Sequence, residues 1–433
     1  MKKTLSNIFG INRNRKSFSY SAVGLLFMLL VIASCSSEES SQKEEKARNM
    51  TKMEQGTFGY DIQFLKKYTD VTVLQNPDSQ GSILVAPIMQ GRVVTSTVAG
   101  KEGKSLGWVN YELIASGEEK EHFTPYGGEG RFWLGPEGGQ YSIFIKPGTE
   151  MTFENWYVPK GFNTEPWKLV SKSDDEVRVE KKLHLTNYSK TPFDIHVDRS
   201  IQLMGQSQIE QLLNIDIPED LKYVAFGSEN TIKNIGENAW TRESGTVSIW
   251  ILGMFTPAPG ITVVVPYKEG SKEQLGPIVN TKYFGEIGPE RIQIEEGVIY
   301  FKVDGKNRRK LGVSPQRALP VAGSYDETNK LLTIIQFSLP EEATDYMNQL
   351  WKQQEHPYQG EAVFAYNDGP LDDGSQLGPF YELESSSPAA FLKPDETLTH
   401  HHRVFHFKGS EQALNAIAEE VLGAGVEQIK SAF

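Results

Sequence analysis

The chain has 433 residues, of which 44 are Lys or Arg and 56 are Asp or Glu, so its formal net charge at neutral pH is −12. Such an acidic chain repels phosphate backbones at long range, and we expect no nucleic-acid partner. A local basic pocket for an acidic sugar remains compatible with this charge. The single cysteine, Cys35, excludes an internal disulfide and a cysteine-based metal site.

The first 34 residues have the pattern of a targeting segment. Basic residues precede an apolar run over residues 22–33, which is too short for a comfortable membrane span but suits a signal-peptide core. The run ends in Ile32-Ala33-Ser34-Cys35, which resembles the lipobox of bacterial lipoproteins. The resemblance implies cleavage before Cys35, acylation of this cysteine and a lipid anchor in the outer membrane. The pair Glu38-Glu39 resembles a surface-export signal, with plain tether charge as the alternative.

Residues 35–56 are rich in Ser, Glu, Lys and Gln and lack apolar periodicity, which predicts a solvated tether. A short helix is then expected at the entrance of the domain. It is indicated by four apolar residues at helical spacing: Phe58, Ile62, Leu65 and Tyr68.

From residue 71 onward, short runs of β-branched and aromatic residues alternate with Gly, Pro, Asn and Asp. No long amphipathic helices alternate with these runs, which disfavours a parallel α/β sheet, and no fixed-period repeat favours a propeller. We therefore predict one mostly β, antiparallel sandwich domain over residues 57–408. The expected strands are 82–88, 92–99, 108–114, 141–145, 177–186, 193–203, 246–254, 261–267, 298–303, 331–339 and 361–366.

Two helices are expected to interrupt the strands. One begins at Pro340, a favoured first helical residue, and continues to Trp351. The other lies in the C-terminal segment 409–433, with Ser410 as its N-cap and an end before Gly423. This helix has an apolar stripe, which predicts that it packs back on the sandwich. The stripe consists of Leu414, Ile417 and Val421.

The best candidate for an active cleft lies in residues 378–407. In a strand there, Tyr381 and Leu383 would face the core, while Glu382 and Glu384 would share the opposite face. Positions two residues apart on a strand are about 6.6 Å apart, which overlaps the carboxyl separation of inverting glycosidases. Hydrolysis by this pair is one alternative, and a solvated acidic face is the other.

Four histidines lie in the next strand-like run. His400 and His402 would share one face of it, with His401 on the other and His406 further along. Such spacing is compatible with zinc, but no partner motif elsewhere has ligand spacing, so no metal is expected. Hydrogen bonding in a sugar pocket is the role predicted for His400 and His402, with ordinary polar-face residues as the alternative.

The same region resembles a known family. An acidic strand of the form Glu-x-x-x-Pro at Glu384, a Leu-x-Pro-x-Glu turn over 392–396 and a strand ending in an aromatic residue resemble the C-terminal signature of the galactose-mutarotase-like (aldose 1-epimerase-like) proteins. The resemblance implies a β-supersandwich fold without a cofactor, and Glu384 as the catalytic base. The turn departs from the family in having Asp395 where Gly is usual.

Two further segments take their expected roles from this resemblance. Residues 126–140 form a glycine-rich stretch that can approach a ligand closely, and the resemblance assigns Arg131 to the sugar site with Trp133 as a stacking surface. A turn-rich loop with Trp133 in the core is the alternative. Residues 185–200 resemble the strand pair that carries the family's catalytic histidine, but this chain has Arg199 there, which cannot act as an acid.

Together these patterns predict a lipid-anchored outer-membrane protein that acts on a sugar in polysaccharide utilisation. Glu384 is the expected base, with Arg131, Arg199 and a histidine as contacts. One alternative is a glycan-binding lipoprotein that has lost the catalytic acid. The other is a glycoside hydrolase or lyase that uses Glu382 together with Glu384.

Overall fold

The computed structural model describes residues 53–371 and 373–433. The predicted signal peptide, lipobox and most of the tether lie outside these residues. Within the described part of the chain, no helix is long and apolar enough to cross a membrane. The strands are β1 (Thr72–Gln75), β2 (Ser82–Ala86), β3 (Arg92–Thr97), β4 (Arg131–Gly135), β5 (Lys168–Lys172), β6 (Glu176–Thr186), β7 (Pro192–Leu203), β8 (Lys222–Asn234), β9 (Ser248–Phe255), β10 (Ile261–Pro266), β11 (Ile292–Glu295), β12 (Val298–Lys302), β13 (Arg309–Val313), β14 (Val321–Asp326), β15 (Leu331–Phe337), β16 (Val363–Asn367), β17 (Tyr381–Ser386) and β18 (Thr397–Lys408).

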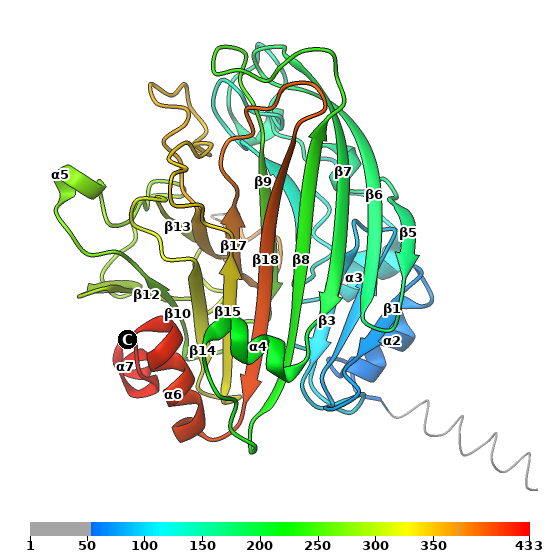
Figure 1. The fold of residues 1–433 in the computed structure, drawn as a ribbon, viewed down its shortest axis with the longest axis vertical. Helices are drawn as coiled ribbons and strands as arrows, with labels where there is room; N and C mark the ends of the chain where they lie inside the picture. Colours follow the sequence, from blue (N-terminus) through cyan, green and yellow to red (C-terminus); the bar gives the residue numbers. More distant parts are fainter. Residues whose placement is uncertain (1–52, 372) are drawn as a thin grey trace, which may run out of the picture. The chain divides into compact units, whose positions relative to one another are not determined.

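Antiparallel pairing joins these strands into sheets (Figure 1). The largest sheet has ten strands in the order β11-β12-β10-β14-β15-β18-β8-β7-β6-β5, and a second has five in the order β13-β16-β17-β9-β4. A third sheet consists of β1, β2 and β3, and Val93 of β3 bridges to Gly130 just before β4. The prediction of a mostly β, antiparallel sandwich is confirmed.

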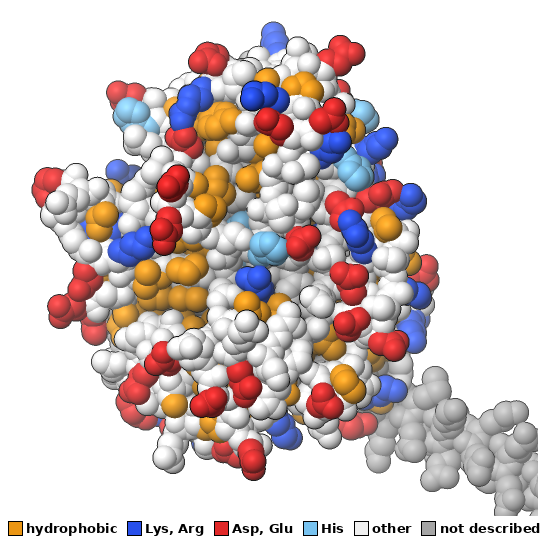
Figure 2. Space-filling model, in the orientation of Figure 1, with side chains coloured by type: hydrophobic (Ala, Val, Ile, Leu, Met, Phe, Trp, Pro, Cys, Tyr) orange, Lys and Arg blue, Asp and Glu red, His pale blue; other side chains and the backbone are white. Residues whose placement is uncertain are grey.

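The long strands of the ten-stranded sheet alternate as a half-buried sheet requires. In β6, Val177 and Val179 are fully buried, while Arg178 and Glu180 face outward. Arg178 pairs there with Asp198 of the neighbouring β7. Figure 2 shows this outer face over β5 to β7, where acidic and basic side chains are interspersed. The face is therefore a solvated surface.

β17 is buried on both faces, and its alternation separates two environments. Tyr381 and Ser385 face the ten-stranded sheet, where they contact side chains of β14 and β18. Glu382 and Glu384 point to the other side of the strand. The prediction that Glu382 and Glu384 share the face opposite Tyr381 is confirmed. This arrangement determines which face of the sheet carries the candidate site.

Helices cover the outer face of the ten-stranded sheet on its β10 to β15 side (Figure 1). The predicted C-terminal helix is α6, with Ser410 accepting a hydrogen bond from the Ala413 amide and Gly423 in the left-handed conformation. Leu414 and Ile417 are buried against the sheet, so the predicted docking is confirmed. The described helices are α2 (Phe58–Leu65), α3 (Tyr111–Ser116), α4 (Gln206–Leu213), α5 (Lys272–Leu275), α6 (Glu411–Leu422) and α7 (Val426–Ser431), with 3-10 turns at Phe153–Asn155 and Lys160–Phe162.

Several predicted elements are wrong. No helix begins at Pro340, because the backbone of Tyr346 pairs with the distant Tyr358 instead of forming local bonds. Segment 108–114 contains α3 rather than a strand, since the Asn110 side chain caps that helix. Segment 141–145 is irregular apart from a single bridge between Ile145 and Trp156, and the Ser142 hydroxyl, which bonds local backbone groups, stabilises it.

Seven strands appear where none was expected: β1, β4, β5, β8, β11, β13 and β14. β4 forms inside the glycine-rich stretch 126–140, because it pairs with β9 over five residues. β8 runs for 13 residues although polar residues interrupt its apolar pattern. Its buried Asn230 accepts a hydrogen bond from Arg199 and donates to the backbone of His400. Partners on neighbouring strands thus satisfy a polar side chain that interrupts the apolar pattern of the strand.

Candidate functional site

The candidate site is the face of the five-stranded sheet that points away from the ten-stranded sheet. Strand pairing brings its side chains together from distant parts of the chain. Glu384 of β17 pairs with Leu252 of β9, which pairs in turn with Arg131 of β4. On the same face, Trp133 of β4 lies opposite Trp250 of β9, and Lys310 of β13 lies two strands from Glu382.

Both strand carboxylates are held by cations. Arg131 donates to Glu382 in an ion pair whose side chains are almost fully buried. The Lys310 ammonium lies 2.8 and 3.1 Å from the two oxygens of Glu384, and the Trp250 indole donates to the same carboxylate at 2.8 Å. In a low-dielectric interior such charge-assisted bonds are strong. We expected Glu384 to keep its carboxylate for a sugar hydroxyl, but it forms a buried ion pair.

Burial shifts the protonation of two carboxyl groups here. The pKa of Glu382 is raised to about 8 by burial, with Glu384 adding to the shift and Arg131 opposing it. The pKa of Glu137, in the segment after β4, is raised by burial to about 7, although Lys310 lowers it. Carboxyl groups with pKa values near the working pH are suited to general acid and base chemistry.

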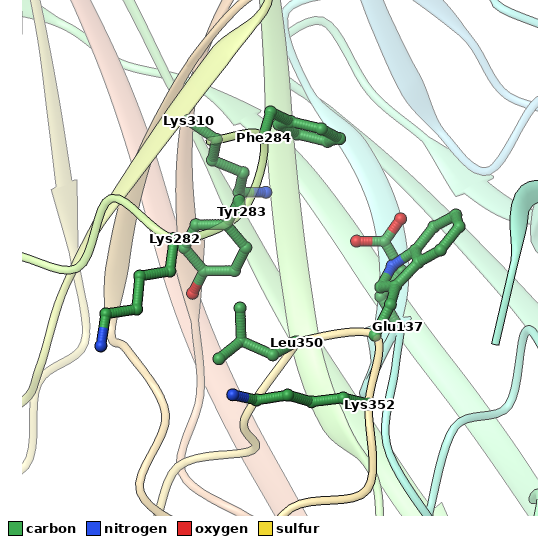
Figure 3. A pocket seen from close by; sticks show the side chains of 8 residues that line it. Glu137, Lys282, Tyr283, Phe284, Lys310, Leu350 and Lys352 are labelled. Atoms are coloured by element: carbon green, nitrogen blue, oxygen red, sulfur yellow. The ribbon is translucent and has the colours of Figure 1, made fainter. Parts of the chain in front are cut away.

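A cavity of about 310 Å³ opens beside these groups. In Figure 3, the Glu137 carboxylate and the Lys310 ammonium point into it from opposite sides, and Lys282 and Lys352 lie at its edge. Its lining is completed by Tyr283, Phe284, Leu350 and Trp351.

A second cavity, of about 70 Å³, adjoins the first and shares Glu137, Phe284 and Lys310 with it. Glu382 lines this second cavity, whereas Glu384 lines neither. Most of the remaining lining is aromatic or apolar, with two arginines: Phe123, Arg131, Trp133, Trp156, Trp250, Leu252, Met254, Arg308, Tyr366, Leu377 and Phe380. Aromatic walls with a few convergent polar groups are typical of small-molecule sites.

Arg131 and Trp133 lie together on this face, as the sequence suggested. The Arg131 guanidinium is 5.2 Å from the centroid of the Trp133 ring. Trp133 is also packed edge-on against Trp250, with ring centroids 5.6 Å apart. Trp133 therefore belongs both to the core and to the wall of the cavity, so the two alternatives for this residue are not exclusive.

The structure does not bring Arg199, His400 and His402 to this face. Arg199 is fully buried on β7 and donates to Asn230 and to the backbone oxygen of Gly130, each at 3.0 Å. His400 and His402 each lie 2.8 Å from the Ser385 hydroxyl. Because Ser385 follows Glu384 on the strand, it points to the opposite face. All three expected contacts therefore lie between the two sheets, away from the cavities.

Burial also makes the paired histidines poor proton carriers. The pKa of His400 is lowered to about 3 by burial, and that of His402 is lowered well below its usual value by burial and by His400. Both rings are therefore neutral at physiological pH. Within the described residues, no cluster of three or more His, Cys, Asp or Glu side chains could hold a metal ion.

Sequence reasoning missed two residues that line both cavities. Glu137 lies in the same glycine-rich stretch as Arg131. The only sequence signal for its role is an acidic residue among glycines. Lys310 ends the basic run Arg308-Arg309-Lys310 in a strand that was not predicted. Its role follows from pairing between β13, β16 and β17, which local sequence does not reveal.

The chain is similar to several solved structures at low sequence identity. A search of curated protein sequences found no match. A solved protein from Synechocystis is 15% identical, with 79% of this chain and 96% of that chain covered and a TM-score of 0.46. A putative aldose 1-epimerase from Escherichia coli is 13% identical, with 78% and 98% covered and a TM-score of 0.47. A galactose mutarotase-like protein from Lactobacillus casei is 10% identical, with 78% and 100% covered and a TM-score of 0.42.

A family model gives a match over nearly the whole described domain. It spans residues 56–433 and describes a family of unknown function, DUF6786. Since the match covers far more than half of the chain, the protein belongs to the DUF6786 family of unknown function.

Proposed function

We propose that the protein binds a carbohydrate on the outer face of the five-stranded sheet and exchanges protons with it. The observation that carries this proposal is the cavity into which Glu137 and Lys310 point, with an aromatic wall around it. Aromatic rings provide apolar area for the C–H faces of a pyranose, while carboxylate and ammonium groups hydrogen-bond its hydroxyls. We further propose that it acts in polysaccharide utilisation, anchored to the outer membrane through Cys35.

The chemistry that fits best is anomeric interconversion of an aldose. A base removes the proton of the anomeric hydroxyl, the bond between the anomeric carbon and the ring oxygen breaks, and an acid protonates that oxygen. With a pKa of about 7, Glu137 is partly ionised at neutral pH and can act as the base. Glu382 lines the adjoining cavity, and burial raises its pKa although Arg131 opposes the shift, so its protonated form can act as the acid.

Glu384 takes a different role in this proposal from the base implied by its sequence. Its carboxylate fixes Lys310, whose ammonium faces the cavity and can stabilise negative charge that develops on a sugar oxygen. Glu384 is thus a positioning residue for Lys310.

The test begins with a panel of sugars screened by thermal shift, followed by NMR measurement of anomer exchange for each sugar that binds. Glu137→Gln keeps the shape of the side chain and removes the base, so we expect exchange to be lost while affinity stays within a few-fold. Glu420→Gln, at an exposed position of α6, is the control. Unchanged exchange in Glu137→Gln would exclude Glu137 as the base.

A non-catalytic glycan-binding protein is the second candidate. It is favoured by the ion pairs that occupy Glu382 and Glu384, and by the absence of any histidine of the described chain from the lining of both cavities. In this case sugars bind but their anomers exchange no faster than in buffer. Hydrolysis or elimination by Glu382 with Glu384 has less support, because Glu384 does not reach the cavities.

A further inference from the structure

A third cavity continues the candidate site. It has a volume of about 560 Å³ and shares Phe123 and Leu377 with the second cavity, which in turn shares Glu137, Phe284 and Lys310 with the first. The three spaces are therefore neighbours that share walls, and we call them together the groove. A single sugar ring would occupy only part of it, since the third cavity alone has the size of an ordinary ligand pocket.

Aromatic side chains follow the whole length of the groove. Phe153 lines the third cavity, Trp156 the second and Trp351 the first. The rings are stacked in succession, with centroids 5.8 Å apart between Phe153 and Trp156 and 5.7 Å apart between Trp156 and Trp351. Phe153 is still 47% exposed, which leaves ring surface for a ligand. Because these rings stack on one another, the surface left for a ligand is the exposed part of Phe153 at one end and the partly exposed Trp351 at the other.

The two ends of the groove differ in charge. At the first cavity, Lys282 and Lys352 are exposed, and neither forms an ion pair within the described residues. At the third cavity the only lysine, Lys120, is paired with Glu118 at 2.8 Å. Two further acids, Glu112 and Glu121, line that end. Within the described residues, the groove's cations without an ion pair are thus Lys282 and Lys352 at the first cavity, the lysine end, and Arg308 at the second, so attraction for an acidic group is weakest at the third cavity.

We propose that the groove binds an oligosaccharide of two or more units, with a unit carrying a carboxylate or sulfate at the lysine end. This inference rests on the proposed function, because it places further units of the same ligand beyond the proton-transfer site. Phe153 supplies the surface for the units furthest from the lysines, and Lys282 and Lys352 set the direction of the chain.

The test measures binding by calorimetry with galacturonate oligomers from monomer to tetramer, and with galactose oligomers of the same lengths. We expect affinity to rise severalfold with length. Phe153→Ala should remove this gain and leave the affinity for the monomer unchanged. Leu169→Ala, at another exposed apolar position, is its control and should keep the gain.

The double variant Lys282→Gln/Lys352→Gln tests the direction. It should weaken binding of the acidic oligomers severalfold more than binding of the neutral oligomers, and flatten the salt dependence of the acidic series. Lys182→Gln, at an exposed position on β6, is the control. Equal loss for acidic and neutral oligomers would overturn the assignment of the lysine end.

The outcomes separate this inference from the function on which it rests. If no sugar of either series binds, the proposed carbohydrate function itself fails. If monomers bind as tightly as oligomers, or if Phe153→Ala keeps the gain in affinity with length, oligosaccharide binding in the groove is excluded. The proposed function then still stands. Unchanged melting temperatures of the variants establish that each is folded.

Discussion

At the scale of single residues, the buried pair of Lys310 and Glu384 should dominate the response to mutation. Lys310→Met removes the cation and leaves the buried Glu384 carboxylate with the Trp250 indole as its remaining side-chain donor among the described residues. We expect a loss of about 3–5 kcal/mol in the free energy of unfolding, measured by urea denaturation. The double variant Lys310→Met/Glu384→Gln removes both charges and should recover most of this loss. Equal stability of wild type and Lys310→Met would show that the pair is not buried in solution.

The carboxyl group of Glu137 should make stability depend on pH. Its pKa is raised from 4.5 to about 7, so the folded protein holds this proton more tightly than the unfolded chain. Ionising the group therefore costs stability, which falls as pH rises through this interval and stays lower above it. Glu137→Gln removes the cost. Its melting temperature relative to wild type should be more favourable at about pH 8 than at about pH 4. A difference that is the same at both pH values would contradict the shift.

At the scale of elements, α6 shows how a surface helix contributes to the sandwich. Leu414 is completely buried between the helix and the ten-stranded sheet. Leu414→Ala should lower the free energy of unfolding by about 2–5 kcal/mol, because it removes buried area and leaves a cavity. Glu420→Ala, on the exposed side of the same helix, should change it by no more than about 0.5 kcal/mol. Thermal and urea unfolding of both variants check this, and a small effect of Leu414→Ala would mean that the helix is undocked.

At the scale of the whole molecule, the sequence makes a prediction about location. We predict that Cys35, outside the described residues, carries the lipid that holds the protein at the membrane. Cys35→Ala should release it into the soluble fraction. Fractionation after a high-salt wash measures this, and retention of the variant in the membrane fraction would refute the anchor.

The sequence by itself determined the features that depend on short-range patterns. The turn-separated apolar runs predict an antiparallel β sandwich, and period-two alternation predicts that Glu382 and Glu384 share a face of β17. The cap at Ser410 and the apolar stripe after it predict α6. Each of these features is decided by residues within a few positions of one another, and so is readable without a structure.

Only the tertiary structure decided which side chains meet. Arg131 and Glu382 form an ion pair across 251 residues of sequence, and Lys310 reaches Glu384 across 74. Which side chains share a space depends on the order of strands in the sheets, because pairing between distant strands fixes both neighbour and face. That order placed Arg199, His400 and His402 between the sheets and put Glu137 and Lys310 at the cavity, a division that no local pattern specifies.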